Sequence, residues 1–235
     1  MRALLLAAGL GTRLHPITES VPKCLVPVRG RPLIDYWFDH LFASAMVERV
    51  LVNTHYLARQ VEDHVANSDW AKRIDLVHES ELLGTAGTIK ANRHYFGSGE
   101  LLVAHADNLT TFDVGHFFAA HAARPARCAM TMLTFRTDDP RSCGIVELDA
   151  SDVVIGFHEK VEDPPGNLAN AAVYVFTPEV ADFVARLDGH VIDLSTEIIP
   201  HFVGRILAFD GRGYHRDIGT IESLRRANED AGRLF

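Results

Sequence analysis

Short apolar runs typical of buried strands alternate with helical patterns through the first half of this 235-residue chain. The first run, at residues 2–8, is continuously apolar, as expected of a strand that is buried on both faces. Further strand-like runs at 49–53, 74–77, 101–106 and 129–135 are separated by helical patterns at 33–45, 58–66, 85–94 and from 113 onward. Because parallel strands need crossover helices, this order predicts an α/β fold with a doubly wound, mostly parallel, Rossmann-like sheet and helices on both faces.

The second half of the chain is richer in strands. Two strand patterns, at 144–148 and 153–159, flank a turn, and further strands are expected at 170–176, 205–209 and 213–217. Helices are expected at 178–187, 195–203 and 221–234. The nearest approach to a linker is the loop at 162–167, so residues 1–235 are predicted to form a single domain with a small β-rich part.

Charge and cysteine content narrow the class of protein. The net charge is −8, which argues against a nucleic-acid partner, yet residues 1–34 carry five basic residues against one acidic residue. That local excess favours an anion site near the N-terminus. The three cysteines show no metal-site spacing and no apolar run reaches 18 residues, so a cytoplasmic protein with reduced thiols and no membrane contact is expected.

A glycine-rich segment, LAAGLGTRL at 6–14, directly follows the first predicted strand. Glycines let backbone N–H groups turn toward a phosphate chain, while Thr12 adds a hydroxyl and Arg13 a guanidinium. A plain glycine-rich turn is the alternative. The dinucleotide fingerprint needs glycine at position 14, where Leu14 stands, and no Walker A pattern occurs. A dehydrogenase and a P-loop ATPase are therefore disfavoured.

A lysine held between prolines follows, in VPKCLVPV at 21–28. Since the prolines fix the backbone path, the Lys23 ammonium is a candidate to neutralise charge on a transferred phosphoryl group, the alternative being a solvated surface lysine. Asp107 ends the fourth predicted strand, and the carboxyl ends of strands are where α/β sheets place ligands.

Together, LAAGLGTRL at 6–14 and PKCLVP at 22–27 resemble the signature of the sugar-1-phosphate nucleotidyltransferases, and similar features continue to Gly219. The resemblance implies a nucleotide-binding part at 1–135 and a sugar-phosphate-binding part with a closing helix at 136–235. It implies nucleotide-binding roles for Leu6, Ala8, Gly9, Gly11, Thr12, Arg13, Lys23, Glu79, Gly84 and Thr85. Glu79 would accept a hydrogen bond from a base N–H.

The same resemblance implies the other site residues. Arg13, Lys23, Asp107 and Asp217 would be catalytic, with Asp107 and Asp217 as ligands of Mg²⁺. Arg216 stands where relatives carry tryptophan. The sugar-phosphate contacts would come from Gly144, Glu159, Lys160 and Asn170.

These residues suit attack by a sugar 1-phosphate on the α-phosphorus of an NTP with release of pyrophosphate. The chain resembles most the short manno-heptose-1-phosphate and mannose-1-phosphate guanylyltransferases. GTP and D-glycero-D-manno-heptose 1-phosphate are therefore the favoured substrates, for bacterial capsule or surface-polysaccharide synthesis. The alternatives are mannose 1-phosphate with GTP, N-acetylmuramate 1-phosphate with UTP, and a catalytically silent regulatory subunit that binds nucleotide sugars. A homo-oligomer is compatible with the sequence.

Overall fold

The computed structural model describes residues 1–234 and contains two compact units, each assembled from separate stretches of the chain. The N-terminal unit comprises residues 2–82, 105–111 and 214 onward. The central unit comprises residues 83–104 and 112–213. No helix of the described residues is both long and apolar enough to cross a membrane.

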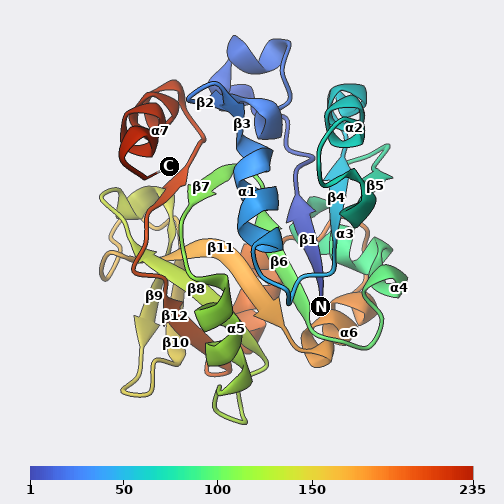
Figure 1. Ribbon diagram of the computed structural model, residues 1–235. Coiled ribbons are helices and arrows are strands. Elements are labelled where there is room, and N and C mark those ends of the chain that lie inside the picture. Colours follow the sequence, from blue (N-terminus) through green and yellow to red (C-terminus); the bar gives the residue numbers. More distant parts are fainter. Residues whose placement is uncertain (235) are drawn as a thin grey trace. The chain divides into compact units, whose positions relative to one another are not determined.

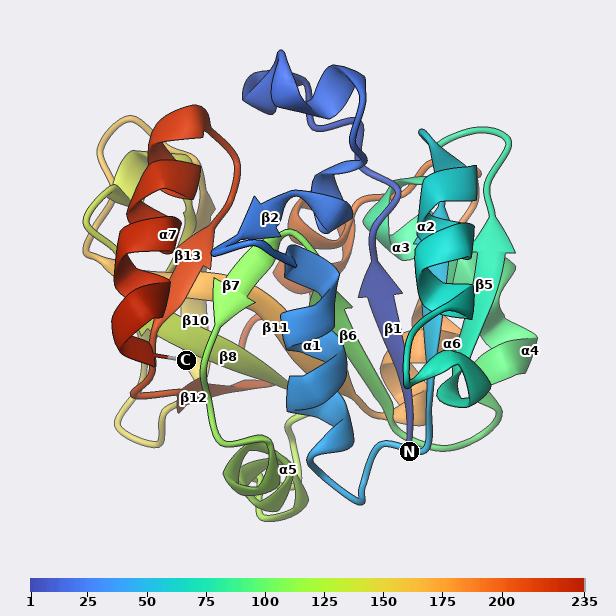
Figure 2. The same ribbon diagram turned by 45° about the horizontal axis from the view of Figure 1, so that its top comes forward.

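The N-terminal unit contains a parallel sheet in the order β1-β4-β5. Its strands are β1 (Arg2–Leu6), β4 (Arg49–Thr54) and β5 (Ile74–His78), with Leu6 opposite Asn53 and Asn53 opposite Val77. Helices α1 (Leu33–Phe42) and α2 (Ala58–Ala66) lie over one face of these strands (Figures 1 and 2). Since the strands are parallel, the segments that follow them meet at one edge of the sheet.

Two short antiparallel ribbons complete this unit together with helix α7 (Ile221–Leu234). Strand β2 (Pro27–Val28) pairs with β3 (Arg31–Pro32), and β7 (Asn108–Thr110) pairs with β13 (His215–Asp217). A strand was expected at 213–217, where β13 lies, but none was expected at 108–110. Strand β7 has only three residues, which is too short for alternation of apolar and polar residues to identify it.

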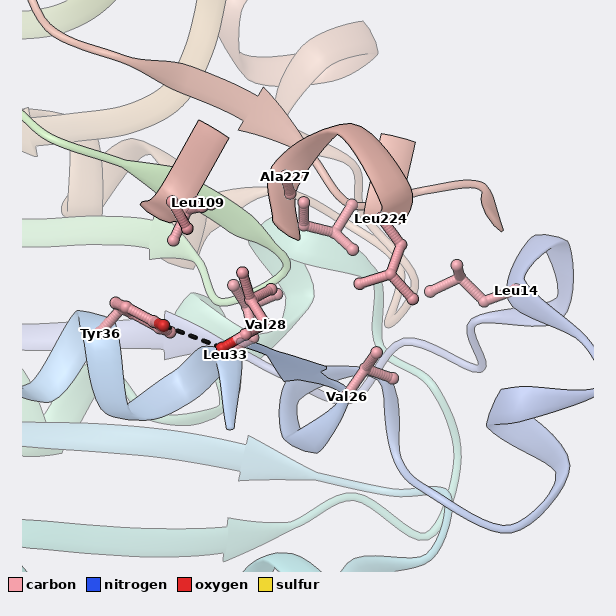
Figure 3. Packing of buried hydrophobic residues seen from close by; sticks show 10 residues of the cluster. Leu14, Val26, Val28, Leu33, Tyr36, Leu109, Leu224 and Ala227 are labelled. Atoms are coloured by element: carbon pink, nitrogen blue, oxygen red, sulfur yellow. Dashed lines mark hydrogen bonds between the residues drawn. The ribbon is translucent and has the colours of Figure 1, made fainter. Parts of the chain in front are cut away.

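An apolar cluster under α7 anchors the backbone beside several candidate site residues (Figure 3). Leu14 follows Arg13, Ile218 follows Asp217, and Leu109 lies two residues beyond Asp107; all three are fully buried in the cluster. The hydroxyl of Tyr36 donates to the Val28 carbonyl at 2.9 Å, which satisfies its polar group inside the cluster. Burying each aliphatic side chain contributes about 1.5–3 kcal/mol, so packing fixes where these segments run.

The central unit contains most of the strands predicted for the second half of the chain, together with residues 83–104 and 112–135. Strand β11 pairs antiparallel with β6, β8 and β9, β9 pairs antiparallel with β10, and β12 pairs parallel with β8. The strands are β6 (Leu101–His105), β8 (Met130–Arg136), β9 (Gly144–Leu148), β10 (Val154–Glu159), β11 (Leu168–Phe176) and β12 (Ile206–Asp210). The helices are α3 (Gly84–Ala91), α4 (Arg93–Phe96), α5 (Val114–Ala122) and α6 (Pro178–Arg186).

The predicted Rossmann-like α/β class is confirmed, but the expected helix at 195–203 is not an α-helix. A π-helical turn spans Leu194–Ile198 and a 3₁₀ turn spans Ile199–Phe202. The side chain of Asp193 accepts from the N–H groups of Ser195 and Thr196, which starts the turn. Pro200 has no N–H to donate back along the chain, so a regular α-helix cannot continue through it.

Candidate active site

The glycine-rich loop leaves β1 in a conformation that only glycine accommodates easily. Gly11 has a φ of +66°, and a Cβ there would lie 3.0 Å from Cγ2 of Thr18 and 3.1 Å from Cβ of Lys23. The Thr18 hydroxyl donates to the Gly11 carbonyl at 2.7 Å. The chain then enters a 3₁₀ turn, Thr12–Leu14, with Thr12 and Arg13 exposed and Leu14 buried. The other loop residues predicted to bind nucleotide, namely Leu6, Ala8 and Gly9, lie at the end of β1 or just beyond it.

Lys23 lies at the centre of the charged site. It opens a 3₁₀ turn after Pro22 and is buried, with 7% of its surface exposed. Its Nζ lies 2.5 Å from Oδ2 of Asp107 and 3.5 Å from Oδ1 of Asp217. The structure therefore brings together three of the four residues predicted to be catalytic, and it excludes a solvated surface position for this lysine.

Backbone pairing brings the two aspartates to this ammonium. Asp107 precedes β7 and Asp217 ends β13, and the Ile218 N–H donates to the Asp107 carbonyl at 3.0 Å. The indole N–H of Trp37 donates to the Asn108 carbonyl at 2.8 Å, which ties the same segment to α1. Arg13, the fourth predicted residue, lies at the exposed rim, with Nη2 3.8 Å from Oδ2 of Asp217.

The protonation states at this site follow from burial and neighbouring charge. Burial on its own would raise the pKa of Asp107, but the Lys23 ammonium outweighs it and holds that pKa below its ordinary value. Burial lowers the pKa of His215 to about 3 and raises the pKa of Cys24 to about 12. At neutral pH the site thus contains an ionised carboxylate, a neutral imidazole and an unreactive thiol.

The two carboxylates fit a divalent cation of the magnesium type. Mg²⁺ is usually bound by one or two carboxylates together with substrate phosphates and water. Within residues 1–234, no group of three or more histidine, cysteine, aspartate or glutamate side chains is arranged to hold a metal ion. A carboxylate pair that already shares one cation, the Lys23 ammonium, meets the requirement of charge and ligand type.

Glu79 lies at the edge of the parallel sheet where the glycine-rich loop leaves β1. It is the first residue after β5 and is buried at 5% exposure, and its N–H donates to the Thr54 carbonyl at 2.8 Å. Its carboxylate accepts from the side-chain amide of Asn53 at 2.9 Å. Acceptance of a hydrogen bond from a base N–H, which the family resemblance implies for Glu79, stays a prediction.

Gly84 and Thr85, also predicted to bind nucleotide, open helix α3 in the central unit. A Cβ on Gly84 would lie 2.5 Å from the Ile192 carbonyl, and Gly84 has a φ of +74°. The Thr85 hydroxyl contacts Asp193 Oδ2 at 3.1 Å and accepts from the Leu194 N–H at 2.7 Å. Packing against residues 192–194 thus explains the glycine at position 84 and the threonine at position 85 in structural terms. Their nucleotide contacts stay a prediction.

Three of the four residues predicted to hold the sugar phosphate, Gly144, Glu159 and Lys160, meet within the central unit. Gly144 opens β9 and pairs with Glu159 at the end of β10. A Cβ on Gly144 would lie 2.6 Å from Oε2 of Glu159, so glycine leaves room for that carboxylate. Lys160 follows with a φ of +50°, and its exposed ammonium lies 3.2 Å from Oε1 of Glu159.

Asn170 is held by its own strand. Its Nδ2 donates to the Tyr174 hydroxyl at 2.7 Å and its Oδ1 accepts from the Ala172 N–H at 2.9 Å. Ala172 has a φ of +54°, and the pairing of β11 with β8 is irregular between Asn170 and Tyr174. This local irregularity fixes the Asn170 amide beside a phenol whose pKa burial raises.

Sequence reasoning missed two residues that shape the site in the N-terminal unit. A Cβ on Gly219 would lie 2.9 Å from Nη2 of Arg13 and would also clash with Oδ2 of Asp217. Asn53 interrupts an apolar strand and contacts both Ala7 and Glu79. The signal available for Asn53 was an amide inside the run VLVN, which is unusual for a buried strand.

The chain matches the model of a protein family described as "Nucleotidyl transferase" over residues 2–233. It is 32% identical to the mannose-1-phosphate guanylyltransferase of Mycobacterium tuberculosis, an alignment that covers 98% of this chain and 64% of that protein. It is 33% identical to the glucose-1-phosphate thymidylyltransferase of Streptomyces griseus, covering 80% of this chain and 52% of that protein. The chain thus spans less than two thirds of the length of either relative.

A solved structure shares the fold. The crystal structure of a Bacillus anthracis protein in complex with a sucrose matches with a TM-score of 0.88 and 21% identity. The match covers 98% of this chain and 95% of that one. At this identity the likeness is one of backbone architecture, and it agrees with the α/β class described above.

Proposed function

The chain belongs to the nucleotidyl transferase family, and we propose that it transfers a nucleotidyl group from an NTP to a sugar 1-phosphate. The observation that carries this proposal is the buried ammonium of Lys23 between Asp107 and Asp217. A site of this kind handles phosphate charge. It combines a buried ammonium with two carboxylates. These carboxylates would bind a metal and its phosphates in place of the ammonium.

In the proposed reaction a phosphate oxygen of the sugar 1-phosphate attacks the α-phosphorus of the NTP. The bond between the α-phosphorus and the bridging oxygen breaks, and pyrophosphate leaves with its electron pair. Since the second pKa of a phosphate monoester is near 6, the nucleophile is already largely ionised at neutral pH and needs no general base. Catalysis then rests on positioning and on neutralising charge.

The residues of the N-terminal unit divide this work. Lys23 neutralises the developing charge on the α-phosphoryl group, and Arg13, at the exposed rim, holds the β- and γ-phosphates or the departing pyrophosphate. Asp107 and Asp217 would hold Mg²⁺, which supplies further charge neutralisation when it is bound. The N–H groups of the loop around Gly9 and Gly11 bind phosphate oxygens.

The residues of the central unit bind the second substrate. The exposed Lys160 ammonium pairs with the sugar phosphate, and Glu159 accepts from sugar hydroxyls. Gly144 permits close approach of the backbone, and Asn170 adds an amide contact. We assign residues 1–135 mainly to nucleotide binding and residues 136–235 mainly to sugar-phosphate binding, within one domain.

The favoured substrates are GTP and D-glycero-D-manno-heptose 1-phosphate. A carboxylate such as Glu79 matches the two adjacent donors of guanine, N1–H and the exocyclic amine, better than the single N–H of uracil or thymine. The similarity to a mannose-1-phosphate guanylyltransferase supports the guanylyl preference. The product, a GDP-sugar, would serve capsule or surface-polysaccharide synthesis in a bacterial cytoplasm.

Pyrophosphate release in Mg²⁺ buffer tests this proposal. Four NTPs are crossed with the 1-phosphates of mannose, manno-heptose, glucose and N-acetylmuramate. Release with GTP and a manno-configured sugar is the expected result. Release only with UTP or dTTP would keep the chemistry and refute the assignment of Glu79. Binding of a nucleotide sugar without any turnover would instead identify a silent regulatory subunit.

A further inference from the structure

Asn53 is a buried amide in the middle of the parallel sheet. It lies in β4, follows the buried Val52, and has 3% of its surface exposed. Burying an amide is unfavourable unless its hydrogen bonds are satisfied, so a side chain of this type in an apolar strand needs specific partners.

Two hydrogen-bond partners of Asn53 come from the segments that follow the two neighbouring strands. Oδ1 accepts from the N–H of Ala7, the first residue after β1, at 2.7 Å. Nδ2 donates to Oε1 of Glu79, the first residue after β5, at 2.9 Å. One side chain thus links the start of the glycine-rich loop to the carboxylate proposed to bind the nucleobase.

The chemistry of the partners fixes the orientation of this amide. A backbone N–H only donates, so the Asn53 oxygen must face Ala7. The NH₂ group is then directed at Glu79, whose carboxylate oxygen accepts. Asn53 therefore favours a single orientation of the Glu79 carboxylate.

We propose that Asn53 is a positioning residue for nucleobase selection. It holds the Glu79 carboxylate at a fixed position relative to the phosphate-binding loop. The inference rests on the function proposed above. Guanine selection then depends on a residue that does not touch the base. Loss of the Asn53 amide frees the carboxylate to rotate, which weakens GTP binding more than UTP binding.

Two substitutions of Asn53 separate this role from a purely structural one. Asn53→Asp keeps the shape and the acceptor for Ala7 but turns a carboxylate toward Glu79, whereas Asn53→Ala removes both contacts and leaves a cavity. A structural role predicts that the alanine variant is the worse one. Positioning of Glu79 predicts that the aspartate variant loses GTP selectivity most, because like charges repel at this distance.

The measurement is equilibrium binding of GTP and of UTP with Mg²⁺, without sugar 1-phosphate, followed by KM for both substrates. We expect GTP affinity to fall about 10-fold in Asn53→Ala and further in Asn53→Asp, with KM for the sugar 1-phosphate within about 2-fold of wild type.

Asn228→Ala is the matched control. That asparagine likewise accepts from a loop N–H, that of Arg29 at 2.7 Å, and donates to the Leu224 carbonyl, away from the site. Its GTP selectivity should stay unchanged.

The outcomes are distinguishable. A wild-type protein with no preference for GTP would refute the proposed guanylyl function. A GTP-selective wild type whose Asn53 variants keep that selectivity, or lose GTP and UTP binding equally, would overturn the positioning role. Asn53→Asp is combined with Glu79→Gln if the single variant fails to fold. The new glutamine supplies an amide donor to the carboxylate introduced at position 53, so the double variant should regain the melting temperature of the wild type. Absence of that rescue would also overturn the inference.

Discussion

Replacing Lys23 by methionine removes the ammonium that two carboxylates share. Removing one partner of a fully buried ion pair costs about 3–5 kcal/mol, because the other charge stays buried without compensation. The side chains of Asp107 and Asp217 are 31% and 52% exposed, so water compensates part of that loss. We therefore expect Lys23→Met to lower the free energy of unfolding by about 1–3 kcal/mol at pH 7. For a chain of this size that is a drop of roughly 3–10 °C in melting temperature.

The pH dependence identifies the cause. In the wild type the pKa of Asp107 lies below its ordinary value of 3.8, so its ionised form stabilises the fold at neutral pH. That contribution is lost as the pH falls through the folded-state pKa. In Lys23→Met the main effect left is burial, which raises the pKa, so the ionised carboxylate becomes destabilising. The difference in stability between the two proteins should be largest near pH 7 and should narrow below about pH 4.

Urea denaturation at pH 7 and at pH 3.5, combined with pyrophosphate release at pH 7, tests this reasoning. Turnover should fall about 10²–10³-fold, by analogy with the loss of one donor to a developing negative charge. Lys72→Met is the control: Lys72 is exposed, so its change should be within about 0.5 kcal/mol. A Lys23→Met protein with wild-type stability at both pH values would refute the claim that this ammonium compensates the two carboxylates.

Four further substitutions probe the rest of the site. Asp107→Asn and Asp217→Asn should each reduce pyrophosphate release at least 100-fold while circular dichroism stays that of the wild type, and near-normal turnover would remove that residue from the site. Gly219→Ala should raise KM for the NTP with little change in melting temperature, since its Cβ would displace Arg13 and Asp217 side chains rather than backbone. Lys160→Ala should raise KM for the sugar 1-phosphate about 10-fold or more and leave KM for the NTP unchanged, and the reverse pattern would contradict its assignment.

Periodicity was sufficient to predict the longer strands and helices. The apolar runs at 2–8, 49–53 and 74–77 correspond to β1, β4 and β5, whose order and direction follow from helices α1 and α2 between them. The helix predicted at 195–203 was wrong because its apolar spacing is compatible with a helix while Pro200, which has no N–H to donate, is not. Local backbone chemistry prevailed over the pattern.

The candidate site was predictable where it is contiguous in the sequence. The loop at 6–14 and Lys23 lie close together along the chain, so their residue types alone indicated phosphate chemistry. The meeting of Asp107 with Asp217 depends on β7 and β13, which are three residues each. Of the two strands, only the one at 213–217 was expected from the sequence, and only the resemblance to a family placed both aspartates in one site.

For residues that serve another residue's side chain, the structural reason was the hardest thing to predict. Gly219 leaves space for Arg13 and Asp217, and Gly144 leaves space for the Glu159 carboxylate, so in each case the reason for glycine lies in a neighbour's side chain. Asn53 is a similar case, since the reason for its amide lies in its contacts with Glu79 and Ala7. For none of the three does the local sequence identify the partner, because the constraint comes from contacts made only after folding. Variants at such positions should alter substrate binding while they preserve the fold, which makes them the most direct test of how this sheet positions its functional groups.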